Sequence, residues 1–245
     1  ICACLVGSEM CIRDSSYMYN GKEMLASPVV LSLYRPVTDN DNRERTGGAR
    51  AWKKAGLDNL VQKATFVESS AKGGKAKVEL LNAEGRKVGT ADFLYTLRKN
   101  GTLEVKTTFV PDTAVITSLA RVGLAFEMPD TYNQVSYLGR GEHETYADRN
   151  RSGRIGIYHT DAERMFHYYV RPQATGNRTD VRWVNLTDEA GNGLTFRSDK
   201  HFQFSVIPFT DMNVDKATHI NELKRTGVVT CLLYTSPSPR DMRRS

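Results

Sequence analysis

The sequence has little cysteine and no long apolar run. Its four cysteines are Cys2, Cys4, Cys11 and Cys231, so residues 16–230 contain none. Cys2 and Cys4 are separated by one residue, which is a poor spacing for a zinc knuckle. No run of 18 apolar residues occurs, so the sequence predicts no membrane span.

Several motifs and charge patterns are also missing. The sequence contains no GxSxG, no P-loop and no GxGxxG. The net charge is +6, but Lys and Arg are scattered among Asp and Glu, so we expect no nucleic-acid partner. Four of the five histidines are widely spaced in the sequence and have no carboxylate at ligand spacing. They are His159, His167, His201 and His219, and we expect no metal site from them.

The two ends differ in character from the rest. Residues 1–15 (ICACLVGSEMCIRDS) and 231–245 (CLLYTSPSPRDMRRS) resemble translated sequencing-adapter fragments. The first is a poor signal peptide because no charged leader precedes its apolar start. We therefore expect an artefactual segment at each end and one incomplete domain at 16–230, and the compartment, cytoplasmic or periplasmic, stays undecided.

Short strands dominate residues 16–230. In 75–81, apolar and charged residues alternate, so Ala76, Val78 and Leu80 share one face. Residues 64–68, 89–97 and 103–109 are also strand-like, and Asn20-Gly21 and Asn100-Gly101 are hairpin-turn signals. Further strands are predicted at 122–127, 135–138, 165–170, 181–186, 194–196, 202–206 and 227–230, with short helices in 49–56 and 216–223. This pattern predicts an all-β fold, a large antiparallel β-sandwich.

An unpatterned, charge-rich stretch follows the apolar run at 29–34. It reads RPVTDNDNRERTGGARAW and spans 35–52. Long unpatterned stretches inside compact domains are often functional. We expect 35–41 to be ordered by Asx-type turns and by an ion pair between Arg35 and an aspartate. In 42–50, Gly47 and Gly48 would let the chain move. Asp39, Asn40 and Asp41 resemble the start of a calcium loop, but Arg50 occupies its twelfth position.

His143 and Glu144 are adjacent in a glycine-containing segment. They can be interpreted as an acid/base pair or metal ligands, or as part of a polar network that holds a loop. We favour the network, because His143 is the only imidazole nearby.

Residues 168–183 mix aromatic rings, amides and guanidinium groups, which is a mixture typical of sugar sites. The sugar-cleft candidates are Arg171, Gln173, Asn177 and Arg182, together with His143 and Glu144 of the preceding segment. The alternative is that Trp183 and Tyr169 belong to the core and the arginines pair with Asp180.

Four ordered stretches together resemble the C-terminal domain, or small chain, of bacterial β-galactosidases of glycoside hydrolase family 2. They are 35–41 with 52–56, 137–149, 169–183, and 208–210 with 219–223. The second resembles Trp-x-Gly-x-Gly-Pro-x-Glu-x-Tyr-x-Asp-Arg, with Tyr137 and Glu142 departing from its Trp and Pro. The third has Ala174 and Thr175 where Glu and Asn are usual.

The resemblance implies a galactose-mutarotase-like super-sandwich, truncated at its C-terminal end. It implies a retaining β-galactosidase whose catalytic glutamates, Mg²⁺ and Na⁺ belong to a TIM-barrel domain outside this chain. No catalytic residue and no cofactor are then expected in this chain, and its partners would be that barrel and a β-galactoside. The 35–48 loop would lie beside the active-site mouth.

Two alternatives remain: a stand-alone carbohydrate-binding module, and an aldose 1-epimerase-like enzyme using His143, His167 or Glu144. Fold alone does not decide between them. Oligomeric state, including a homo-oligomer, also stays open.

Overall fold

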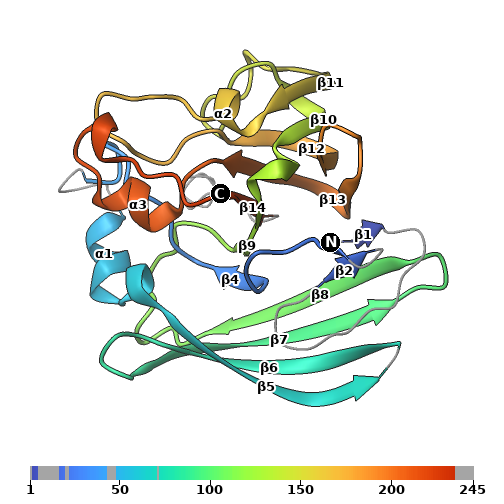
Figure 1. Ribbon diagram of the computed structural model, residues 1–245. Helices are drawn as coiled ribbons and strands as arrows, with labels where there is room; N and C mark the ends of the chain where they lie inside the picture. The colour runs from blue at the N-terminus through green and yellow to red at the C-terminus, as the bar shows by residue number, and fades with distance from the viewer. Residues whose placement is uncertain (1, 5–16, 20–21, 43–47, 71, 235–245) are drawn as a thin grey trace.

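The computed structural model describes residues 2–4, 17–19, 22–42, 48–70 and 72–234. The chain forms an antiparallel sandwich in two layers (Figure 1). The lower layer holds β5 (Val61–Ser70), β6 (Gly73–Leu81), β7 (Lys87–Leu97) and β8 (Thr102–Pro111). The upper layer holds β10 (Gln134–Gly141), β11 (Arg154–Asp161), β12 (Arg178–Thr187) and β13 (Gly193–Ile207). The all-β sandwich predicted from the sequence is confirmed.

Shorter strands connect these layers. β4 (Val30–Ser32) pairs with β9 (Gly123–Pro129), which pairs with β14 (Val228–Tyr234), which in turn pairs with β13. β1 (Cys2–Cys4) lies between β8 and β13. β2 (Met18–Tyr19) and β3 (Lys22–Glu23) form a separate ribbon, and the predicted turn Asn20-Gly21 lies outside the described residues.

Helices are few and short. They are α1 (Ala49–Lys54), α2 (Ala162–Met165), α3 (Asp211–Lys216) and the 3-10 turns η1 (Leu57–Asn59), η2 (Asp130–Tyr132) and η3 (Ile220–Glu222). None of the helices in the described residues is long and apolar enough to span a membrane.

The alternation read from the sequence correctly assigns the buried face of the lower layer. Ala76, Val78, Leu80, Ala91 and Phe93 are all buried in one core cluster. A second cluster fills the upper layer around β9, β10, β12 and β14. Burial of these apolar side chains is the main stabilising contribution to the sandwich.

One strand prediction was wrong, two predicted strands form one continuous strand, and one strand was missed. Residues 165–170 are not a strand, because Asp161 caps α2 by accepting a hydrogen bond from the Arg164 backbone N–H (2.8 Å), and an irregular loop follows. The runs at 194–196 and 202–206 belong to the single strand β13. β11 was missed because its apolar residues Ile155 and Ile157 are exposed on an edge strand.

The strand expected to end at Thr230 continues through Tyr234. Cys231, Leu232 and Leu233 are buried, and β9 and β13 pair with them on both sides. Pairing on both sides satisfies the backbone N–H and C=O groups of this segment, and burial of its apolar side chains stabilises it. The adapter interpretation of 231–245 stays a prediction, as does that of 1–15.

Gln62 connects the two parts of the sandwich. Its Nε2 donates to the Leu31 carbonyl (2.7 Å), and its Oε1 accepts from the Leu31 N–H (3.1 Å). The side-chain amide of β5 therefore satisfies the edge of β4 as a neighbouring strand would.

We expect Gln62→Ala to lower the free energy of unfolding by about 1–3 kcal/mol, because it leaves two backbone groups without partners. Lys63→Ala, at an exposed position on the same strand, is the matched control. Urea denaturation measures both. Equal stability of the two variants would show that the bridge contributes nothing.

Candidate functional site

A hollow of about 400 Å³ lies where three loops meet. The loops follow β4 (residues 33–42), β10 (142–149) and α2 (166–177). Its lining includes four of the predicted site residues: Arg35, Asn40, Glu144 and Gln173. The rest of the lining is largely polar and aromatic, and includes Tyr146, Tyr169, Tyr234, Arg121, Arg149 and Gln203.

The first loop is ordered by Asp41, as the sequence predicted. Arg35 Nη2 lies 3.0 Å from Asp41 Oδ1, and Asp41 Oδ2 accepts hydrogen bonds from the Thr38 N–H (2.9 Å) and hydroxyl (2.6 Å). The Arg35 guanidinium also lies 5.6 Å from the ring centroid of Trp52 in α1. Charge pairing and stacking together orient Arg35 toward the hollow.

Gly48 is placed by packing. Its backbone is right-handed (φ −91°), and a Cβ atom there would lie 2.6 Å from the Trp52 ring. The absence of a side chain at Gly48 therefore allows the Trp52 ring to pack against its backbone. Gly47 lies outside the described residues, and the loop movement expected of this glycine pair stays a prediction.

Asp39 and Gln173 join the first loop to the third. The Asp39 N–H donates to Gln173 Oε1 (3.3 Å), and Gln173 Nε2 donates to Asp39 Oδ2 (3.5 Å). These residues are 134 positions apart in the sequence. Two stretches singled out separately therefore form one edge of the hollow.

Glu144 joins the second loop to the third. Its carboxylate is buried and accepts hydrogen bonds from the Tyr169 hydroxyl, the Thr175 hydroxyl (2.7 Å) and the Gly176 N–H (3.1 Å). Arg149 lies 3.6 Å away. Burial acts to raise the pKa of Glu144, but these donors outweigh it and hold the pKa below its ordinary value.

His143 does not share this environment. It is exposed, and its Nε2 contacts the Ser152 hydroxyl at 2.9 Å. The polar-network interpretation of Glu144 is therefore confirmed, while an acid/base pair with His143 is not formed. In the described part of the chain, no three His, Cys, Asp or Glu side chains are grouped so as to hold a metal ion.

The third loop carries a left-handed glycine. Gly176 has φ +80°, and a Cβ there would approach the Met165 carbonyl to 2.8 Å. Only glycine suits both the dihedral angle and the space. This conformation aims the Gly176 N–H at Glu144.

Asn177 supports the hollow from behind. Its Nδ2 donates to the Thr145 carbonyl and to Gln203 Oε1, both at 2.9 Å, and its Oδ1 accepts from the Tyr234 hydroxyl. Asn177 is 1% exposed, so it holds the wall rather than facing a ligand.

Arg178 is a structural residue that sequence reasoning missed. It is buried, and its guanidinium donates to the Tyr137 hydroxyl (2.9 Å) and to the carbonyls of Gly176, Asn177 and Glu142. It ties the second loop to the third. No local spacing signals such a clamp, because its acceptors are mostly backbone oxygens.

Arg171 and Arg182 do not line the hollow. Arg171 is exposed, and Arg182 donates to the Asp180 carbonyl (2.7 Å). The alternative left open from the sequence, in which this segment's arginines pair with the Asp180 carboxylate, does not hold, because that carboxylate pairs with Arg140 of β10. Tyr169 and Trp183 are only partly buried.

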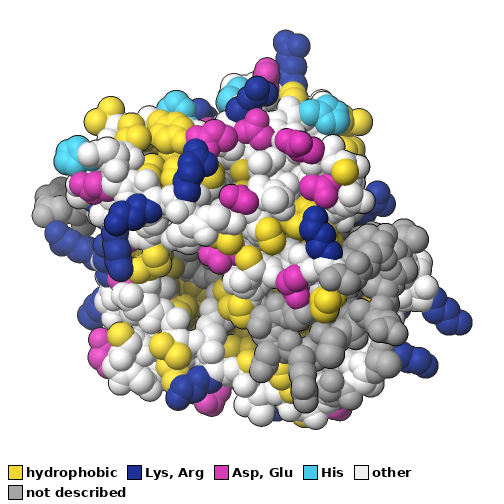
Figure 2. Space-filling view, in the orientation of Figure 1, with side chains coloured by type: hydrophobic (Ala, Val, Ile, Leu, Met, Phe, Trp, Pro, Cys, Tyr) yellow, Lys and Arg dark blue, Asp and Glu magenta, His cyan; other side chains and the backbone are white. Residues whose placement is uncertain are grey.

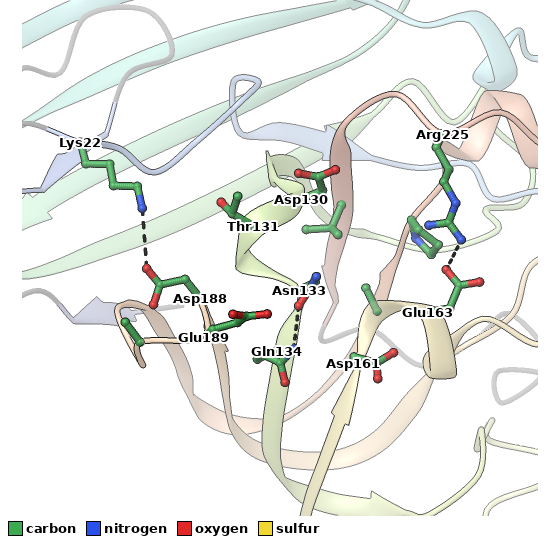
Figure 3. Close-up of a pocket in the computed structure, with 14 residues that line it drawn as sticks. Lys22, Asp130, Thr131, Asn133, Gln134, Asp161, Glu163, Asp188, Glu189 and Arg225 are labelled. Carbon is green, nitrogen blue, oxygen red and sulfur yellow. Dashed lines mark hydrogen bonds and ion pairs between the residues drawn. The ribbon is translucent and has the colours of Figure 1, made fainter.

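A second hollow, of about 820 Å³, contains none of the predicted site residues (Figure 3). Ion pairs stand at either end, Lys22 with Asp188 at 3.6 Å and Arg225 with Glu163. Other carboxylates line it as well: Asp130, Asp161 and Glu189.

Comparison with known proteins identifies the family. The family model described as "Beta galactosidase small chain" matches residues 13–236. The chain therefore belongs to the β-galactosidase small-chain family. The match runs past the domain limits expected from the sequence, by residues 13–15 and 231–236.

Relatives of this small chain are themselves named β-galactosidases. A β-galactosidase of Priestia megaterium is 27% identical over 88% of this chain and 20% of its own length. The β-galactosidase BgaC of Bifidobacterium adolescentis is 28% identical over 86% of this chain and 20% of its own length. The β-galactosidase of Kluyveromyces lactis is 30% identical over 80% of this chain and 19% of its own length. The chain spans about a fifth of the length of these relatives.

In this small chain, Glu144→Gln should lower the free energy of unfolding at neutral pH by about 1–3 kcal/mol. Because folding lowers the pKa of Glu144, the carboxylate stabilises the fold above its ordinary value of 4.5, and that stability is lost as the pH falls through the folded-state pKa. The difference in the free energy of unfolding between wild type and Glu144→Gln should therefore become smaller below pH 4.5.

Glu142→Gln, an exposed carboxylate on the same loop, is the control. Denaturation curves measured across acidic and neutral pH follow both variants. If the difference in the free energy of unfolding between wild type and Glu144→Gln does not change with pH, the negative charge of Glu144 does not stabilise the fold.

Proposed function

We propose that this chain is the small-chain domain of an enzyme that hydrolyses terminal β-D-galactose residues. In this proposal it packs on a catalytic barrel outside the chain, and the hollow helps to form the mouth of the active site. Family membership carries the proposal, since the relatives are named β-galactosidases and are about five times longer. Mg²⁺ and Na⁺ would be bound outside this chain.

The chemistry of the hollow supports this role. Tyrosine rings can stack on a sugar face, and amide and guanidinium groups can bind its hydroxyls. Glu144 is committed to three hydrogen bonds, so it is poorly placed to act as a nucleophile or general acid. Glycoside hydrolysis by this mechanism needs two available carboxyl groups.

The loop between α2 and β12 supports contact with another domain. Val170 is 89% exposed, and the neighbouring Tyr169 and Gln173 line the hollow. Figure 2 shows apolar side chains gathered beside this loop, at the upper left of the view. A group of apolar side chains at an exposed surface is typical of a surface that another element covers.

The first test compares the 245-residue chain with the full-length protein. We expect the full-length protein to hydrolyse nitrophenyl β-galactoside and the chain alone to be inactive, because its catalytic carboxylates would be absent. Turnover by the purified chain, free of host enzyme, would contradict the proposal. Calorimetric titration with galactose and lactose tests the alternative of a stand-alone binding module, which sub-millimolar affinity of the chain would favour.

The second test concerns the hollow. In the full-length enzyme, Asn40→Ala and Gln173→Ala should raise KM by about 3- to 10-fold, the equivalent of one lost hydrogen bond each. Gln134→Ala removes an exposed amide from the second hollow and serves as the control. If all three variants retain wild-type KM and kcat, the hollow is not part of the active-site mouth.

A further inference from the structure

The outward face of the upper layer carries a row of large side chains across four strands. In the antiparallel register, Ile157 of β11 pairs with Leu138 of β10, Leu138 with Trp183 of β12, and Trp183 with Arg197 of β13. Directly paired residues point to the same side of a sheet. We call these four residues the outer row.

The outer row is exposed and mostly apolar. Ile157 is 61% exposed, and Ile155, two residues away on the same face, is 47% exposed. Leu138 and Trp183 are each partly exposed. A contiguous apolar group that includes tryptophan is typical of a surface that binds a partner.

The neighbouring polar row argues against a sugar as that partner. Asn185 Nδ2 donates to the Ser136 hydroxyl (3.1 Å), and Asn185 Oδ1 accepts from the Thr195 hydroxyl (2.8 Å). These groups satisfy one another along the sheet instead of projecting toward a ligand. A sugar site requires available donors and acceptors, whereas a protein interface requires a flat, internally satisfied surface.

The backbone beside Trp183 is held in an uncommon conformation. Asp180 has φ +53°, next to a register shift in β12, and its carboxylate pairs with Arg140. Arg182 donates to the Asp180 carbonyl at 2.7 Å. These contacts fix the segment that presents Trp183 to the outer face, and strained positions of this kind are often associated with function.

We infer that the outer row is an interface, covered in the complete protein by another part of the same polypeptide. That surface would be apolar, with a carboxylate opposite Arg197, which is exposed and has no side-chain ion pair with any residue the structure describes. We assign the covering surface to the same polypeptide because the chain spans only about a fifth of the length of its relatives, and the other four fifths need surfaces of this domain to pack on. The inference rests on the proposed function, in which this chain is one domain of a longer enzyme.

The test uses calorimetric unfolding of the full-length protein and of the chain alone, each carrying Ile157→Lys. The matched control is Val110→Lys on β8, an apolar position that is 58% exposed in the other layer. In the full-length protein, Ile157→Lys should lower Tm by on the order of 3 °C, and Val110→Lys should leave it unchanged. In the chain alone, neither variant should lower Tm.

Other outcomes would overturn the inference. Equal Tm values for both variants in the full-length protein would show that nothing packs on the row. An equal loss in the chain alone would assign Ile157 to the internal stability of this domain. A dimer of the chain that Ile157→Lys dissociates would identify a second copy as the occupant. Quenching of Trp183 fluorescence by galactan fragments, without a change in Tm, would identify a sugar.

Turnover of nitrophenyl β-galactoside is measured on the same samples. An inactive full-length protein contradicts the proposed function. An active protein whose Tm is insensitive to Ile157→Lys contradicts only the interface.

Discussion

The buried carboxylate of Glu144 holds together the loops on which the hollow depends. Tyr169, Thr175 and the Gly176 N–H all donate to it, so one charge in the second loop fixes the path of the third. Arg178 makes the reciprocal connection through the carbonyl of Glu142. Because Glu144 is buried and bonded to the third loop, and Arg178 is buried and bonded to both loops, the shape of each loop depends on the other.

The sheet was largely predictable because strand periodicity is a local signal. Ala76, Val78 and Leu80 alternate with charged residues, and the structure buries all three. β11 was not predicted, because its apolar residues Ile155 and Ile157 face outward instead of forming a buried face. Residues 165–170 were misassigned because their aromatic composition favours a strand, while the Asp161 cap and the following loop depend on tertiary contacts.

The site was predictable as composition but not as geometry. Charged loops and amide-rich segments marked Arg35, Asn40, Glu144 and Gln173, which the fold brings to one hollow. Sequence spacing could not show that Asp39 contacts Gln173, since 134 positions separate them. Nor could it separate Asn177, which is buried behind the wall, from residues that face the hollow.

The placement of tryptophan has an optical consequence. The chain has two tryptophans, and they lie in different environments. Trp52 is 3% exposed beside Arg35 and Gly48, whereas Trp183 is partly exposed on the outer row. Emission from Trp52 should be blue-shifted and reflect the packing behind the 35–41 loop, while emission from Trp183 should respond to solvent at the opposite layer. Each region of the domain thus contains its own intrinsic chromophore.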